Sequence, residues 1–181
     1  LLKPEPQNWL MYRGTYNGHG YSPLDKINTK NVKRLTPVWS LSMENDFGEQ
    51  AQPMIHNGVM YVSDAKWTVA IDAVSGKRLW RTAVDFAPDT PRVVCCGVSN
   101  KGVALYNGKV FRTTLHAFVV ALDQKTGKEV WRTHTVPVGN EKGAETWKGD
   151  SGKTGGGTAW LVGSYDPKLN LVYYGTSNPA P

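Results

Sequence analysis

The stretch "VMYVSDAKWTVAIDAVSGKRLWRT", residues 59–82, returns in altered form as "VFRTTLHAFVVALDQKTGKEVWRT", residues 110–133. The two copies align without a gap, so that Gly76 matches Gly127. Each copy follows an Asn-Gly pair, which between apolar runs is the strongest short signal for a β-hairpin. Each copy and the strand before it therefore predict four short antiparallel strands in about 50 residues, which is the size of one β-propeller blade.

A tryptophan stands at the same place in each repeat, at Trp80 and Trp131. A third, Trp39, lies in "VKRLTPVWSLSM" at residues 32–43, which we interpret as the closing strand of a blade completed elsewhere. A large aromatic ring at a recurrent position is typical of packing between repeats. We therefore assign the three tryptophans to the scaffold.

The sequence predicts an all-β fold, a partial β-propeller built from four-stranded antiparallel blades. A propeller closes with about four to eight blades, and an open arc leaves two sheet edges uncovered. Residues 1–181 are thus expected to be part of a larger propeller or a shortened one. The predicted parts are an amino-terminal segment 1–43, blades at about 44–82 and 94–133, and an incomplete blade at 155–181.

The charge distribution argues against several classes of partner. The net charge of the 181 residues is +6, but the basic residues are scattered, so no nucleic-acid arm is expected. They indicate a solvated surface or, alternatively, a surface that meets an acidic protein. No apolar run approaches 18 residues, so no membrane span is predicted. The four histidines do not show metal-binding spacing, and no nicotinamide-binding glycine motif is present.

The only two cysteines, Cys95 and Cys96, are adjacent in "RVVCCGVSN". Neighbouring Cα atoms lie about 3.8 Å apart, whereas an ordinary disulfide spans about 4.4–6.8 Å. The pair therefore either remains as two thiols or closes a strained ring.

Several segments together resemble the quinoprotein alcohol dehydrogenases, which depend on pyrroloquinoline quinone (PQQ). The resemblance covers nearly the whole chain. Its most selective parts are the adjacent cysteines followed by "SNKG" and the run "GGGTAW" with "SNPAP" behind it. The resemblance implies an eight-bladed propeller with PQQ near its axis and a bound Ca²⁺ or, in some members, a lanthanide. It also implies a disulfide between Cys95 and Cys96 that covers one face of the quinone.

The other site residues are implied by the same resemblance. Trp160 matches the indole that stacks on the second face of the quinone, and Asn178 matches an asparagine that binds the metal through its amide oxygen. Without the resemblance, Trp160 is more typical of a core residue and Asn178 of a turn. Thr113 matches a threonine that binds the quinone carboxylates, with a plain strand residue as the alternative.

Three further positions match the family less closely. Lys101 stands where the family usually has an arginine beside the quinone carbonyls, so the charge is kept and the bidentate fork is lost. We assign Lys101 the catalytic role of electrophilic assistance. Gln50, with Glu49 one residue earlier, occupies the place of a family glutamate near the cofactor.

The sequence also departs from the family. The family has a further blade between "VWRT" and the glycine-rich run, with a glutamate that binds the metal. Here that blade is missing, and Glu141 and Glu145 lie in a shortened link without the family's context. The family's catalytic aspartate would lie beyond Asn178.

The resemblance implies a periplasmic oxidoreductase that oxidises a primary alcohol and passes electrons to a c-type cytochrome. We expect this chain, as a part or shortened form of such an enzyme, to have little or no turnover alone. The alternative is a non-enzymatic β-propeller scaffold that binds proteins through its repeats. Such a scaffold needs neither the adjacent cysteines nor the spacing from Trp160 to Asn178.

Overall fold

The computed structural model describes residues 5–45, 47–94, 97–154, 157, 159, 164–166 and 168–176. Within them, antiparallel strands dominate and helices are limited to single turns. The strands form two four-stranded sheets, joined in chain order, and one separate hairpin. This confirms the predicted all-β class with four-stranded antiparallel blades.

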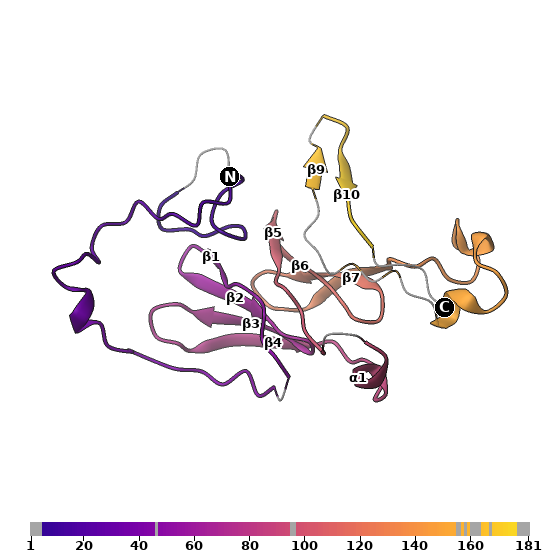
Figure 1. Cartoon of the computed structure of the whole chain (residues 1–181), viewed down its shortest axis with the longest axis horizontal. Helices are drawn as coiled ribbons and strands as arrows, with labels where there is room; N and C mark the ends of the chain where they lie inside the picture. Colours follow the sequence, from indigo (N-terminus) through magenta and orange to yellow (C-terminus); the bar gives the residue numbers. More distant parts are fainter. Residues whose placement is uncertain are drawn as a thin grey trace.

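The two sheets are called blade 1 and blade 2, and they lie side by side in Figure 1. Blade 1 consists of β1 (Met54–His56), β2 (Val59–Ser63), β3 (Trp67–Asp72) and β4 (Arg78–Ala83). Blade 2 consists of β5 (Ala104–Tyr106), β6 (Lys109–Thr113), β7 (Phe118–Asp123) and β8 (Glu129–His134).

The remaining elements are short. They are η1 (Val32–Arg34), α1 (Thr90–Val93), η2 (Ala144–Thr146), α2 (Ser151–Thr154) and the paired strands β9 (Ser164–Asp166) and β10 (Leu171–Tyr173). No helix among the described residues has the length and apolar character needed to cross a membrane.

The hairpins form where the Asn-Gly pairs predict them. Asn57 and Gly58 have φ values of 51° and 77°, and Asn107 and Gly108 have 44° and 70°. Two successive positive φ angles are the requirement of a type I′ turn, whose twist matches that of the strands. Each blade also has an irregular register at the same place, at Ala70/Ile71 and at the corresponding pair of blade 2.

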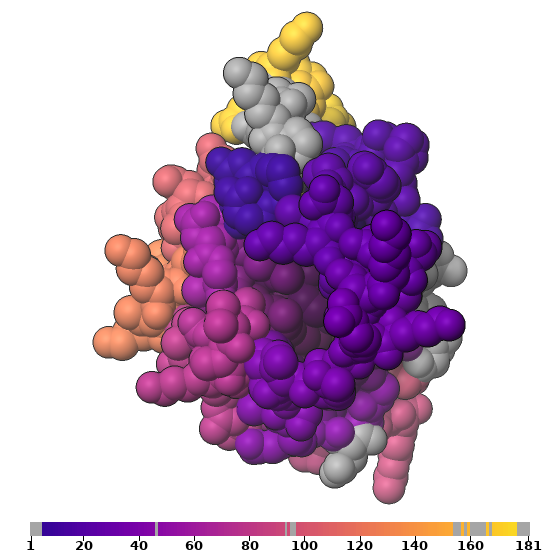
Figure 2. Space-filling model, turned by 90° about the vertical axis from the view of Figure 1, so that its left-hand side faces the viewer, coloured from indigo at the N-terminus to yellow at the C-terminus, as the bar shows by residue number. Residues whose placement is uncertain are grey.

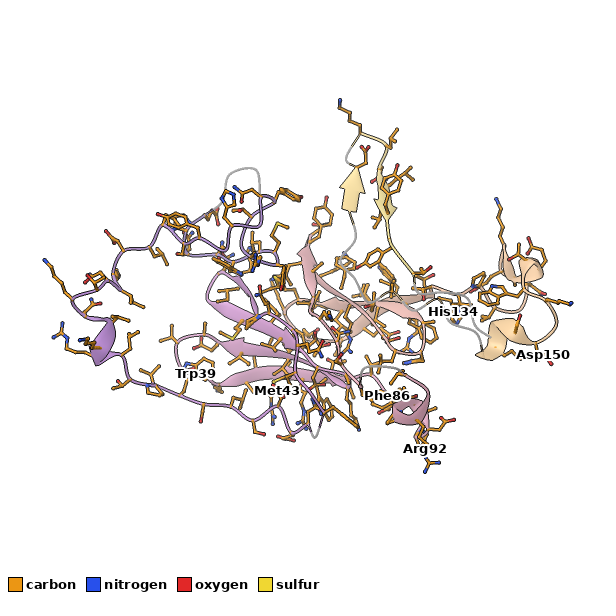
Figure 3. The ribbon with its side chains drawn as sticks, viewed as in Figure 1. Trp39, Met43, Phe86, Arg92, His134 and Asp150 are labelled. Carbon is orange, nitrogen blue, oxygen red and sulfur yellow. The ribbon has the colours of Figure 1, made fainter. Side chains whose placement is uncertain are left out.

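Alternation along β3 sends side chains to two different cores. Ala70 is fully buried in the core between the blades, which also contains Met54, Tyr61, Val103, Val110, Val120 and Leu122. Its neighbours Val69 and Ile71 point to the opposite face, because successive strand residues alternate. There they pack with Met43, against Trp39 and Leu41 of the amino-terminal segment, and Figure 3 shows Trp39 and Met43 along this side of blade 1.

Two of the recurrent tryptophans lock neighbouring units together. The Trp80 indole nitrogen of blade 1 donates to the carbonyl oxygen of Gln124 in blade 2 at 3.1 Å, and Trp39 donates to Ala73 in the same way at 3.2 Å. A Cβ placed on Gly127 would lie 2.6 Å from the Trp80 ring, so only glycine allows this close approach. The scaffold role predicted for these two tryptophans is confirmed.

The amino-terminal segment runs along blade 1 without joining its sheet over residues 32–43. It contains the single turn η1 and then extended backbone, with no strand in this range. None of the described strands pairs with that range, so the closing strand of a blade completed elsewhere stays a prediction. Instead, Trp9 pairs with Ile55 on the free edge of β1, and the segment borders a hollow on the face shown in Figure 2.

Candidate functional site

The candidate site residues that the structure describes lie at one end of the two blades. Each strand runs opposite to the one before it, so the tight Asn-Gly turns and the Gly76 and Gly127 turns all fall at one end, which we call the turn end. The opposite end, the loop end, holds the approach to β1, the β2–β3 connection, the approach to β5 and the β6–β7 connection. Non-repeating loops on a repeating scaffold are where binding residues concentrate.

Three separate segments bring predicted residues to the loop end. Gln50 and Glu49 are exposed on the segment that leads into β1. Lys101 is exposed just before β5, and Thr113 is the half-buried last residue of β6. The structure thus places these four residues, which lie up to 64 positions apart in the chain, at the same end.

The other predicted site residues, Cys95, Cys96, Trp160 and Asn178, lie outside the described residues. Their roles, including the disulfide, stay predictions.

Asn100 holds the approach to β5 against both blades. Its side-chain oxygen accepts hydrogen bonds from the Ser63 hydroxyl at 2.7 Å and from the Gly102 backbone N–H at 3.0 Å. Its side-chain nitrogen donates to the Thr113 carbonyl at 2.8 Å. Ser63 ends β2 of blade 1 and Thr113 ends β6 of blade 2, so one buried amide joins the loop to the two strand ends.

Arg112 adds a buried positive charge at the loop end. Its side chain is 2% exposed, and its guanidinium donates to the carbonyls of Asp64 and Ala65 and to the Thr68 hydroxyl, each at 3.0 Å. These acceptors lie in the β2–β3 connection and at the start of β3, so an arginine of blade 2 fastens blade 1. Burial lowers the pKa of Arg112 to about 10, and the nearby Asp64 charge opposes that shift. The guanidinium therefore stays charged at neutral pH.

Asp64 organises the connection that receives Arg112. One carboxylate oxygen accepts from the backbone N–H groups of Lys66 and Trp67, at 2.7 and 2.5 Å. The second oxygen is buried and has no hydrogen-bond partner. The carboxylate is thus stabilised through one oxygen and by the charge of Arg112 nearby.

The sequence reasoning did not single out Asn100, Ser63, Asp64 or Arg112. Arg112 carries a signal that the sequence contains: it stands two positions after Val110, on the face of β6 that strand alternation predicts to be buried. A charged residue on a buried face needs partners. Asn100 and Ser63 carry no comparable signal, because their pairing depends on how the two blades meet.

The two glutamates of the link that follows β8 form hydrogen bonds with groups at the end of β8 and within that link. Glu141 accepts from the Val138 backbone N–H at 2.9 Å and contacts the His134 ring nitrogen at 3.0 Å. The Val138 N–H and then His134 hold the pKa of Glu141 below its ordinary value. Glu145 accepts from the Gly143 N–H at 2.8 Å. Across the described part of the chain, no three or more His, Cys, Asp or Glu residues gather as a metal site.

Comparison with known proteins matches this fold to one family. The model of the PQQ family, described as the glucose/ethanol/alcohol dehydrogenase β-propeller domain, matches residues 9–129 and 112–181. The quinoprotein alcohol dehydrogenase PedH of Pseudomonas putida is 36% identical over 234 residues, covering 91% of this chain and 39% of the relative. A lanthanide-dependent methanol dehydrogenase of Methylacidiphilum fumariolicum is 30% identical and covers 98% of this chain and 41% of the relative.

Solved structures show the same likeness. A europium-containing methanol dehydrogenase matches with a TM-score of 0.72 and 30% identity, covering 97% of this chain and 43% of that one. A quinohemoprotein alcohol dehydrogenase from Comamonas testosteroni matches with a TM-score of 0.71 and 29% identity, covering 97% and 36%. BamB from Moraxella catarrhalis, at 20% identity and a TM-score of 0.50, shares the fold alone.

The alignment lengths show that the relatives contain residues that this chain lacks. Because 91% of the 181 residues is about 165 residues, an alignment of 234 residues contains roughly 70 positions at which the relative has a residue and this chain has none. A four-stranded blade takes about 50 residues, so the total difference in length is comparable to one blade with its connections. Residues 112–129 fall in both matched ranges of the family model, as expected when one repeat can align with two.

The chain spans about two fifths of the length of these two relatives. The match to the family model extends over most of its residues, and the two four-stranded blades with their locking tryptophans agree with it. The chain therefore belongs to the PQQ family of glucose, ethanol and alcohol dehydrogenase β-propeller domains.

Proposed function

We propose that this chain supplies one side of the quinone site in a PQQ-dependent alcohol dehydrogenase that oxidises primary alcohols. The observation that carries the proposal is the convergence of Gln50, Lys101 and Thr113 at the loop end from three separate segments. The family assignment supports the reaction class, since the curated relatives include quinoprotein alcohol and methanol dehydrogenases.

The charges at the loop end suit the cofactor. PQQ is a planar quinone with three carboxylates, so a site for it needs cations and hydrogen-bond donors. The exposed ammonium of Lys101 and the buried guanidinium of Arg112 supply positive charge, and the Thr113 hydroxyl can donate. When bound, PQQ would supply the two-electron acceptor for alcohol oxidation.

Each site residue has a role in the proposal. Cys95 and Cys96, joined as a disulfide, and Trp160 would contact the two faces of the quinone. Thr113 would bind a carboxylate, and Lys101 would donate to a quinone carbonyl with Gln50 or Glu49 beside it. Asn178 would contribute one oxygen ligand to Ca²⁺ or a lanthanide.

The metal and the catalytic base limit what the chain does alone. A hard cation such as Ca²⁺ takes six to eight oxygen ligands, and the described residues offer no acidic cluster for it. We therefore propose that the chain binds PQQ but has little or no alcohol turnover. In the whole enzyme, further blades would complete the site, in the periplasm, with a c-type cytochrome as electron acceptor.

A binding titration tests this proposal. Adding PQQ to the purified 181-residue chain should quench its tryptophan fluorescence saturably, while dye-linked oxidation of ethanol with PQQ and Ca²⁺ should stay at the background rate. Lys101→Ala should weaken PQQ binding by about tenfold, because a charge-assisted hydrogen bond is lost. Lys109→Ala is the matched control, since Lys109 lies beside the Asn107-Gly108 turn at the opposite end.

Two results would count against the proposal: equal weakening by Lys101→Ala and Lys109→Ala, or no binding at all. Measurable turnover would refute its second part.

The intact mass tests the disulfide separately. Under non-reducing conditions, a disulfide between Cys95 and Cys96 lowers the mass by about 2 Da, the mass of two hydrogens lost on oxidation. A free dithiol in protein exported to an oxidising compartment would instead favour the non-enzymatic scaffold.

A further inference from the structure

One buried amide is bonded to both blades and to the loop that carries Lys101. Asn100 is 9% exposed and Ser63 is 1% exposed, so neither is in a position to exchange these hydrogen bonds freely for water. The Asn100 side chain uses both acceptor positions of its oxygen and one of its two N–H donors. A buried side chain that makes this many hydrogen bonds holds the groups around it in place, because breaking any one of these bonds leaves a buried polar atom unpaired.

The surroundings of Asn100 leave Lys101 as the exposed residue of an anchored loop. Val98 and Val103, on either side, are 3% and 7% exposed and hold the loop to the core. Gly102 adopts a φ of 129°, and a Cβ on it would lie 3.8 Å from the backbone oxygen of Gln52. The loop therefore reaches the segment that leads into β1, two residues from Gln50.

We propose that Asn100 and Ser63 are positioning residues that fix Lys101 relative to the two blades. They act through the loop and do not themselves contact the quinone or the alcohol. This inference rests on the proposed function, because a lysine aimed at a quinone carbonyl contributes only if its distance to the carbonyl is held. The hydrogen bonds of the Asn100 side chain run from the loop to the ends of β2 and β6 or close the loop on itself.

Two substitutions separate positioning from general stability. Ser63→Ala removes one hydroxyl donor to Asn100, and Asn100→Asp keeps the side-chain size but removes the donor to the Thr113 carbonyl. Ser63→Thr keeps the hydroxyl and should therefore keep both the PQQ affinity and the slow amide exchange of the loop. The matched control is Thr82→Ala, which removes another hydroxyl that donates between the blades, to the Gly127 carbonyl at 2.6 Å, at the turn end of blade 2.

The experiment measures PQQ affinity and hydrogen exchange of residues 97–102 in the full 181-residue chain. Ser63→Ala and Asn100→Asp should weaken PQQ binding by about fivefold to tenfold and speed amide exchange in the loop by about tenfold. Ser63→Thr and Thr82→Ala should both stay within about twofold of the wild type in affinity and in loop exchange. Urea unfolding of all variants records their stability, so that a general loss is recognised.

The outcomes distinguish the two proposals. If the wild-type chain does not bind PQQ, the proposed function fails, and loop exchange alone then decides whether Asn100 and Ser63 hold the loop. If Ser63→Ala and Asn100→Asp match Thr82→Ala in affinity and in loop exchange, the positioning role is refuted.

Discussion

The contact between Trp80 and Gly127 is a direct test of how the blades are joined. Gly127 has a φ of 70°, and a Cβ built on it would lie 2.6 Å from two atoms of the Trp80 ring and 2.8 Å from the Thr82 hydroxyl. Gly127→Ala therefore carries two costs. A non-glycine residue in the left-handed region costs about 1–2 kcal/mol, and overpacking a rigid contact costs about 1–3 kcal/mol. We expect Gly127→Ala to lower the free energy of unfolding by about 2–5 kcal/mol.

Gly108 provides the control because it has the same φ angle as Gly127 but no neighbouring atoms that an added Cβ would meet. Its φ is also 70°, but nothing lies within 4 Å of the Cβ that alanine would add. Gly108→Ala should therefore carry only the backbone cost, about 1–2 kcal/mol. The difference between the two variants measures the contact of residue 127 with the Trp80 ring and its neighbour Thr82.

The assay is urea unfolding followed by far-UV circular dichroism, which does not depend on tryptophan emission. A second comparison, in a Trp80→Ala background, should reduce the cost of Gly127→Ala towards that of Gly108→Ala, because most of the crowding is gone. The reasoning is refuted if Gly127→Ala and Gly108→Ala cost the same. It is also refuted if the cost of Gly127→Ala is unchanged when the ring is absent.

Three further predictions concern other contacts. Trp80→Ala should lower the free energy of unfolding in urea by about 3–4 kcal/mol. Trp131→Ala should lower it by only about 1–2 kcal/mol, because Trp131 is 41% exposed. Equal losses would contradict the packing described. Arg112→Met should cost about 3 kcal/mol because two buried carbonyls and a carboxylate lose their cation, and a loss below about 1 kcal/mol would show that other groups replace the guanidinium. Burial, and then the charges of Arg132 and Arg112, lower the pKa of His116 in the folded chain. The unfolded chain then binds the proton more readily, so stability should fall as pH drops from about 7 through the ordinary histidine range. His116→Gln should remove this part of the pH dependence of the urea midpoint, and an unchanged dependence would contradict the assignment.

Local signals were sufficient to predict the blades. The Asn57-Gly58 and Asn107-Gly108 pairs predicted the hairpins, because both residues of a type I′ turn need positive φ and these residue types tolerate it. The recurrent tryptophans predicted packing between units, since the same large side chain returns beside the same glycine turn. Such features depend on a few neighbouring residues, so a single sequence contains them.

The candidate site was only partly accessible from the sequence. The position of Lys101 at the loop end follows from the strand order, but its anchoring by Asn100 depends on where β2 and β6 end in space. The closing strand expected at residues 32–43 stays a prediction for a related reason. A strand needs partners, and no described strand pairs with that segment.

The two repeats themselves distinguish scaffold from site. From Val69 to Thr82 they stay alike, with Val120, Ala121, Asp123, Gly127 and Trp131 at the matching places. This part contains the glycine turn and the tryptophan, which for Gly127 and Trp80 form the contact between the two blades.

Before Val69 the correspondence shifts by one residue, because Val59 pairs with Asp72 whereas Lys109 pairs with Asp123. The gap-free alignment of the two copies is therefore wrong in β2 and β6, and the extra residue of blade 2 lies in the β6–β7 connection at the loop end. Tyr61 therefore corresponds to Phe111, since they pair with Ala70 and Ala121, and each ring lies against the tryptophan of its own blade.

Arg112 takes the place of Val62: the valine packs against an apolar cluster, whereas the arginine binds carbonyls of the neighbouring blade. A position that packs towards the preceding unit in both blades, but changes from an apolar side chain to a cation, is not under the constraint of blade-to-blade packing alone. The turn end is thus repeated because Trp39 on Gly76 and Trp80 on Gly127 make the same contact, whereas the loop end differs in the groups that the two blades place there.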